Sequence, residues 1–160
     1  MGVVTTSDSG EQHDGRILKL AQQLESLTEA CERHFADTGS YGHEYNAHPP
    51  QHRKLSATQS TEGWNGPYIS QALSPASNPW GSCHLYRHLQ TNENPGFDLD
   101  ADGELESIGP GNAFYLAGVP QEEARRLDTL VDASLGGQDW ASSGRLNWLE
   151  GDRVFVFLYR

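Results

Sequence analysis

Between residues 14 and 37, apolar side chains recur every three or four positions, and mostly polar side chains fill the positions between them. This spacing places the apolar residues on one face of an α-helix. They are Ile17, Leu20, Leu24, Leu27, Cys31 and Phe35. The helix is expected to end at residues 37–40, Asp-Thr-Gly-Ser, because glycine accepts the left-handed conformation in which many helices terminate. The apolar face needs a second layer to cover it, and the rest of the chain must supply that layer.

The remainder of the chain predicts a small antiparallel sheet. Strand-like runs occur at 83–89 and 113–116, and residues 145–149 and 153–159 read as a hairpin. A short second helix is expected from Pro120 to about residue 132. Its acidic residues are expected on the outer, solvated face; they are Glu122, Glu123, Asp128 and Asp132. Residues 42–62 are polar and predict a long connecting loop. The expected fold is therefore α+β, an N-terminal amphipathic helix packed on a small antiparallel sheet.

The length of 160 residues indicates one domain, expected over residues 14–160. Residues 1–13 are polar and are expected to be a flexible N-terminal segment or an artificial addition. The 22 acidic residues outnumber the 11 basic ones, for a net charge of −11, and no basic patch interrupts this excess. Such a charge repels phosphate backbones, so nucleic acid is not expected as a partner. No apolar run approaches the roughly 20 residues of a membrane-spanning helix.

Residues 63–81, GWNGPYISQALSPASNPWG, combine aromatic, proline and glycine residues in a pattern that suits neither a helix nor a strand. Prolines reduce the entropy that the loop loses on ordering, and large aromatic rings can cover a small core. We therefore expect a fixed structural or interface loop, formed chiefly by Trp64, Pro67, Tyr68, Pro79 and Trp80. The alternative is an extracytoplasmic binding module in which Trp64, Tyr68 and Trp80 bind a glycan or peptide.

Four short segments follow one another in a characteristic order. They are Ala-Asp-Thr-Gly-Ser-Tyr at 36–41, Gly-Trp-Asn-Gly-Pro-Tyr-Ile at 63–69, Asn-Pro-Trp-Gly at 78–81, and Tyr86. In this order and spacing the chain resembles type IV pilin-like proteins, particularly the pseudopilins of type II secretion systems. The resemblance covers roughly residues 17–109, with a weaker match over 118–146.

The resemblance implies a pilin-like fold and a structural role, as a subunit of a type IV pilus-like or type II secretion pseudopilus filament rather than an enzyme. Its partners would be other pilin-like subunits and an inner-membrane assembly platform. Contact with the membrane would run only through an apolar N-terminal helix that this sequence lacks. The protein would lie in the cell envelope, anchored in the inner membrane, with its globular domain in the periplasm or on an extracellular filament. The resemblance leaves open whether such a filament would serve protein secretion, DNA uptake or adhesion.

Asp98, Asp100 and Asp102 alternate with other residues ahead of Gly103. This is the spacing with which the first half of an EF-hand loop presents oxygen ligands to Ca²⁺. The position that would supply the closing bidentate glutamate is Gly109, and Glu106 comes too early to take that role without a different wrap. The resemblance also implies calcium, which major pseudopilins bind in a loop of this neighbourhood. The alternative is a solvated acidic turn.

The two cysteines, Cys31 and Cys83, form either one disulfide or a pair of buried free thiols. His43, His48 and His52 lie within ten residues and invite a zinc hypothesis. Pro49 and Pro50 forbid the helix that would align His48 with His52, so this hypothesis is disfavoured. The sequence contains no G-x-S-x-G, P-loop, G-x-G-x-x-G or H-E-x-x-H motif and gives catalysis no positive support.

Overall fold

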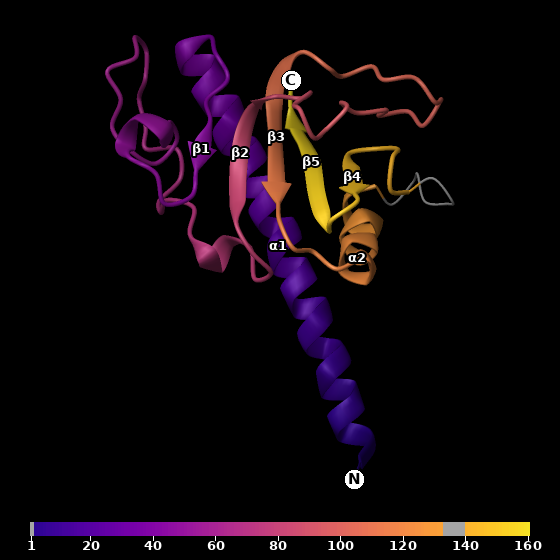
Figure 1. Ribbon diagram of the computed structural model, residues 1–160. Coiled ribbons are helices and arrows are strands. Elements are labelled where there is room, and N and C mark those ends of the chain that lie inside the picture. The colour runs from indigo at the N-terminus through magenta and orange to yellow at the C-terminus, as the bar shows by residue number, and fades with distance from the viewer. Residues whose placement is uncertain (1, 133–139) are drawn as a thin grey trace.

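A computed structural model describes residues 2–132 and 140–160, with the backbone alone for residues 2–14 (Figure 1). The helices are α1 (Gly2–Thr38) and α2 (Gln121–Val131), with short 3₁₀ turns η1 (Pro50–His52) and η2 (Pro75–Ser77). The strands are β1 (Glu44–Tyr45), β2 (Cys83–His88), β3 (Pro110–Leu116), β4 (Leu146–Leu149) and β5 (Arg153–Tyr159). They form one antiparallel sheet in the order β1-β2-β3-β5-β4. The expected α+β class is confirmed.

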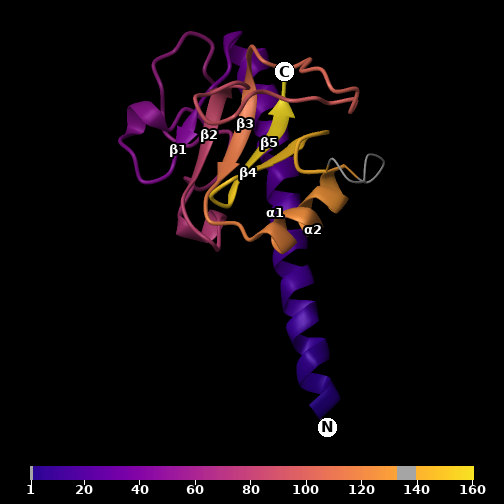
Figure 2. The ribbon, with the colours of Figure 1, turned by 45° about the vertical axis from the view of Figure 1, so that its right-hand side comes forward.

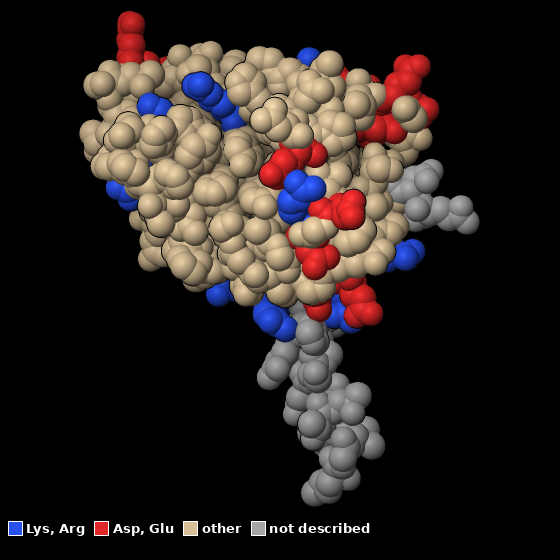
Figure 3. Space-filling model, in the orientation of Figure 1, with Lys and Arg blue, Asp and Glu red and all other residues tan. Residues whose placement is uncertain are grey.

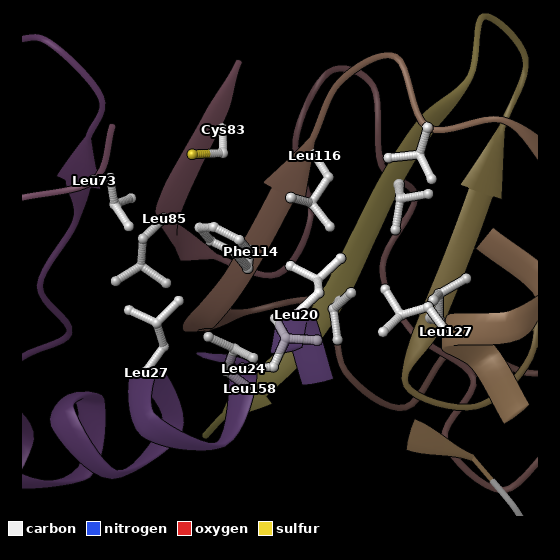
Figure 4. Packing of buried hydrophobic residues seen from close by; sticks show 14 of the residues in the cluster. Leu20, Leu24, Leu27, Leu73, Cys83, Leu85, Phe114, Leu116, Leu127 and Leu158 are labelled. Carbon is white, nitrogen blue, oxygen red and sulfur yellow. The ribbon is translucent and has the colours of Figure 1, made fainter. Parts of the chain in front are cut away.

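Helix α1 crosses one face of the sheet, and the predicted apolar stripe faces it. Figure 4 shows Leu20, Leu24 and Leu27 pointing from the helix toward side chains of the sheet. The sheet side of this core contains Leu85, Phe114, Leu116, Val154, Val156 and Leu158, all buried. The helix ends as predicted, where Gly39 adopts a φ of 74° and its N–H donates to the carbonyl of Phe35 at 2.7 Å.

The helix starts earlier than the sequence pattern indicated, at Gly2 rather than at residue 14. Its 37 residues correspond to a length of about 55 Å at 1.5 Å per residue. Figures 1 and 2 both show that the N-terminal part of α1 projects well beyond the sheet. The protein therefore consists of a globular head and a helical stalk that is continuous with the core of the head.

The predicted β2, β3, α2 and the β4–β5 hairpin all occur, with ends shifted by a few residues at most. The structure adds β1, a two-residue strand inside the predicted loop 42–62. Glu44 of this strand is buried, and its carboxylate accepts hydrogen bonds from the backbone N–H groups of Leu55 (3.0 Å) and Ser56 (3.2 Å) and from the Ser56 hydroxyl. These bonds fold the loop back on itself, while the backbone of β1 pairs with β2.

The acidic residues of α2 are not all solvated, contrary to the sequence expectation. Glu123, Asp128 and Asp132 are buried, because α2 packs against α1 and β4. Both carboxylate oxygens of Asp132 accept the N–H of Arg145 at 2.9 Å, which ties the end of α2 to the start of β4. Burial and a hydrogen bond with Asp132 raise the pKa of Asp128 to about 7.

We expect the free energy of unfolding to fall as the pH rises from about 4 to about 7, because of the Asp128 carboxyl group. Its folded-state pKa is raised, so the folded chain holds a proton that the unfolded chain has released, and stability is lost as that proton leaves. The substitution Asp128→Asn removes this ionisation and should raise the free energy of unfolding at pH 8 by on the order of 2 kcal/mol. Urea titrations of the wild type and of Asp128→Asn, each at pH 5 and pH 8, measure these free energies of unfolding. Glu122→Gln, on the exposed face of α2, is the control, and an equal pH dependence in Asp128→Asn and wild type would contradict the prediction.

Candidate functional site

The acidic loop, defined as residues 97–107, lies on the connection from β2 to β3 (Figure 1). It is folded into a narrow arm by a bridge between Phe97 and Ser107, whose backbones exchange hydrogen bonds of 2.9 and 3.2 Å. The ring of Phe97 is fully buried in a second apolar cluster with Leu89, Ala113 and Phe155, which anchors the arm to the head. The position of the loop is thus determined by core packing.

Asp98 organises the tip of the acidic loop. It is 6% exposed, and its two carboxylate oxygens accept the N–H groups of Asp102 (3.1 Å) and Gly103 (2.8 Å). Asp100 also accepts from the N–H of Asp102, at 3.2 Å. The three aspartates singled out from the sequence therefore share one tight turn, in which Gly103 has a φ of 91°.

The bridge between Phe97 and Ser107 brings a fourth carboxylate, that of Glu106, into the group. Asp98, Asp100, Asp102 and Glu106 each offer an oxygen, and these four atoms all lie within 4.8 Å of one another. Glu106 also accepts the N–H of Leu99 at 2.8 Å. In an EF-hand wrap Glu106 would come too early to be a ligand, but this arm closes differently and places Glu106 beside the three aspartates.

Electrostatics make this cluster receptive to a cation. Acidic side chains gather over the loop at the upper right of Figure 3. A hydrogen bond with Asp100 raises the pKa of Glu106 to about 7, so near neutral pH a proton offsets part of the repulsion among the carboxylates. A metal ion with oxygen ligands could take the place of that proton.

The first half of the loop 63–81 is fixed to the C-terminal end of α1. The Tyr68 hydroxyl donates to the Asp37 carboxylate at 2.7 Å and accepts the N–H of Asn65 at 2.8 Å. The indole N–H of Trp64 donates to the carbonyl of Lys54 at 2.7 Å, and the Trp64 and Tyr68 rings meet edge to face. Gly63 is required here: its φ is 85°, and a Cβ would stand 2.0 Å from the carbonyl oxygen of Asp37.

The second half of this loop is fixed at a different place, the turn after β3. The side-chain amide of Asn78 donates to the carbonyls of Ser82 (2.8 Å) and Ala117 (2.9 Å), and its oxygen accepts the N–H of Trp80 at 3.1 Å. The Trp80 backbone lies against Gly118, where a Cβ would meet the Trp80 carbonyl at 2.6 Å. Trp80 is therefore anchored apart from Trp64 and Tyr68, while Pro67 and Pro79 remain exposed.

Both cysteines are buried free thiols in the structure. Cys31 lies on the sheet-facing side of α1, and Cys83 is the first residue of β2. Burial raises the pKa of both thiols, that of Cys83 to about 11. Thiolate chemistry is thus suppressed at both positions.

Comparison with protein-family models, with curated proteins and with solved structures finds no match to this chain. Among the described residues, no helix is both long enough and apolar enough to cross a lipid bilayer.

Proposed function

We propose that the chain is the head and part of the stalk of a filament subunit of the type IV pilin-like class, in the manner of a pseudopilin of a type II secretion system. The observation that carries this proposal is α1, a helix of 37 residues whose C-terminal half packs on an antiparallel sheet while its N-terminal part projects beyond the head (Figure 1). Most helices in proteins owe their stability to tertiary packing. A projecting stalk gains such packing when stalks of several subunits lie side by side.

Apolar surface at the base of the head supports the same assembly. Leu18 of α1 and Leu130 of α2 are 52% and 49% exposed. They line a shallow groove with Ile17, Arg126 and Thr129, where α1 leaves the head. In a filament, neighbouring stalks would cover this groove. The order of segments in residues 36–86 that resembles pilin-like proteins is independent support from the sequence.

In this proposal the stalk continues upstream into an apolar segment held in the inner membrane before assembly. The head lies in the periplasm or on an extracellular filament. The subunit contacts other pilin-like subunits and an inner-membrane assembly platform. The two loops fixed to the head, residues 63–81 and the acidic loop, supply outer contacts between subunits.

Filament assembly can be tested in the source cells with antibody raised against the head. We expect immunogold electron microscopy to show labelled filaments, which disappear when the gene is deleted. The variant Leu18→Asp, restored to the deletion strain, should reduce labelling strongly while leaving the melting temperature of the isolated head nearly unchanged. Glu29→Ala, on an exposed position of α1, is the matched control. A protein that stays dispersed in cells that produce it at normal levels would overturn the proposal.

We further propose that the acidic loop binds Ca²⁺. Three carboxylates on one turn and that of Glu106 beside them offer only hard oxygen ligands, which suit Ca²⁺ better than softer metals. The ion would fix the tip of the loop, where the hydrogen bonds of Asp98 already define the turn.

Addition of millimolar Ca²⁺ should raise the melting temperature of the head, and EGTA should reverse the shift. Binding at 100 times the Kd stabilises the folded state by about 2.7 kcal/mol, which for a chain of this size corresponds to roughly 5–10 °C. The double variant Asp100→Asn/Asp102→Asn should abolish the shift. Affinity should fall from pH 8 to pH 6, because the raised pKa of Glu106 lets protons compete. A melting temperature indifferent to Ca²⁺ at pH 8 would reject the site.

A further inference from the structure

Four of the seven histidines of the chain surround one tyrosine at the β1 edge of the sheet. The ring centroids of His43, His48, His52 and His84 lie 4.7, 5.4, 5.7 and 5.2 Å from that of Tyr45. The ring centroids of His48 and His52 are 5.9 Å apart, and those of His43 and His52 are 5.5 Å apart. His52 thus neighbours both His43 and His48, and the fold gathers imidazoles from the residue before β1, the loop after it, η1 and β2.

The contact between His43 and His52 has the dimensions of a pair of metal ligands. The Nε2 atom of His43 lies 3.3 Å from the Nδ1 atom of His52. Two nitrogens bound tetrahedrally to one zinc ion, at about 2.0–2.1 Å each, lie roughly 3.3–3.4 Å apart. A metal ion can therefore take the place of the proton between the two rings at an unchanged nitrogen–nitrogen distance, once each ring turns so that its lone pair points to one side of the line that joins the nitrogens.

Pro49 and Pro50 do not keep His52 away from His43. Pro49 and Pro50 do exclude a helix through His48 and His52, but they permit the 3₁₀ turn η1, in which the N–H of His52 donates to the carbonyl of Pro49 at 2.9 Å. A second backbone bond, from the N–H of Lys54 to the carbonyl of His43 at 2.9 Å, returns the chain to β1. These two bonds, and not helical spacing, place His52 beside His43.

His48 can become a third ligand once its ring turns, because among the described residues no three histidine nitrogens yet lie within 4.8 Å of one another. Its Nδ1 lies 2.7 Å from the carbonyl oxygen of Asn46, an acceptor only, so Nδ1 carries the proton and Nε2 carries the free lone pair. A hydrogen bond from one ring nitrogen to a carbonyl is the usual support for a metal-binding histidine. The side chain is exposed, so it can turn toward the other two rings. Nearby, the Nδ1 atom of His84 is buried without a hydrogen-bond partner.

We propose that His43, His52 and His48 bind a divalent transition-metal ion of the zinc class, with water as a fourth ligand. Imidazole nitrogens suit Zn²⁺, Cu²⁺ and Ni²⁺ and do not suit Ca²⁺, so this site is distinct in chemistry from the acidic loop. Arg87 and Lys54 carry positive charge near His43 and oppose a bound cation, so we expect moderate rather than extreme affinity. The bound ion would fix the loop 46–52 against the β1 edge of the head.

The test is calorimetric titration of untagged, metal-free protein with ZnCl₂, in saturating Ca²⁺ so that the acidic loop is already occupied. We expect about one Zn²⁺ per chain, a higher melting temperature, and a visible absorption spectrum of tetrahedral type when Co²⁺ replaces Zn²⁺. His52→Ala and His48→Ala should each weaken binding at least about tenfold. His88→Ala is the matched control, because His88 lies exposed at the end of β2.

Two results would overturn the proposal: no heat of Zn²⁺ binding with the folded wild-type protein, or equal affinity in wild type and His52→Ala. The second result would place the ion elsewhere. His43 is buried, so His43→Ala is interpreted only if its circular dichroism matches that of wild type, while the exposed and half-buried positions His48 and His52 carry the test. Neither result bears on filament assembly, which is measured separately.

Discussion

Replacing Leu24 by alanine should lower the free energy of unfolding by about 3 kcal/mol, within the range measured for leucine truncations in well-packed cores. Leu24 is 1% exposed and lies in the layer between α1 and the sheet, near Phe114 and Leu158 (Figure 4). Truncation removes buried apolar area and leaves a cavity that a helix on a sheet cannot easily close. Chemical denaturation followed by circular dichroism measures the loss.

Leu18 provides the matched control for Leu24. It is on the same helix and has the same side chain, but it is 52% exposed. Leu18→Ala should cost less than about 1 kcal/mol, because little apolar area of this residue is buried in the isolated head. Equal losses in the two variants would mean that α1 is not seated on the sheet as the structure has it.

Replacing Asn78 by alanine should lower the free energy of unfolding by about 3 kcal/mol through polar contacts rather than a cavity. Asn78 is 1% exposed, and its side chain makes three hydrogen bonds, to the carbonyls of Ser82 and Ala117 and from the N–H of Trp80. Alanine removes the partner of the Ala117 carbonyl and of the Trp80 N–H, while the Ser82 carbonyl keeps its bond from the N–H of Ala117 at 2.9 Å. The expected result is a lower denaturation midpoint with a folded-state spectrum that is otherwise unchanged.

Two further variants sharpen the result for Asn78. Asn78→Asp keeps the size of the side chain but sets a carboxylate oxygen against two carbonyl oxygens, so it should be at least as destabilising as alanine at pH 7. Asn65→Ala is the control, because Asn65 is exposed in the same loop and contributes only its backbone N–H to Tyr68. Tolerance of Asn78→Asp would show that the amide does not hold the loop.

The elements that sequence analysis could predict are those specified by a local period. Ile17, Leu20, Leu24 and Leu27 repeat at helical spacing over about three turns, and the run from 154 to 158 has strong strand propensity next to a short acidic turn. In that turn Gly151 and Asp152 have φ values of 87° and 57°, as a tight hairpin requires. In such segments, neighbouring residues carry enough information to define the structure.

The parts that sequence analysis missed depend on partners distant along the chain. Strand β1 has only two residues, so its sequence shows no strand periodicity. It is fixed where the Glu44 carboxylate accepts hydrogen bonds from the backbone N–H groups of Leu55 and Ser56. Glu106 joins the acidic cluster through the pairing of Phe97 with Ser107, which spacing alone does not reveal. The charge of Asp128 suggests a position in solvent, whereas packing of α2 against α1 and β4 buries this side chain.

The continuity of the stalk with the core determines how the head responds to tension. A pull on the N-terminal end of α1, directed along the helix axis, loads the contacts of Leu20, Leu24 and Leu27 in shear. In this direction the interlocked side chains must yield together, whereas a pull across the axis would separate them one at a time. Forced unfolding is governed by the rate of crossing that barrier and not by the equilibrium stability of the fold. The helix is thus placed so that an axial load meets the whole apolar layer between α1 and the sheet at once.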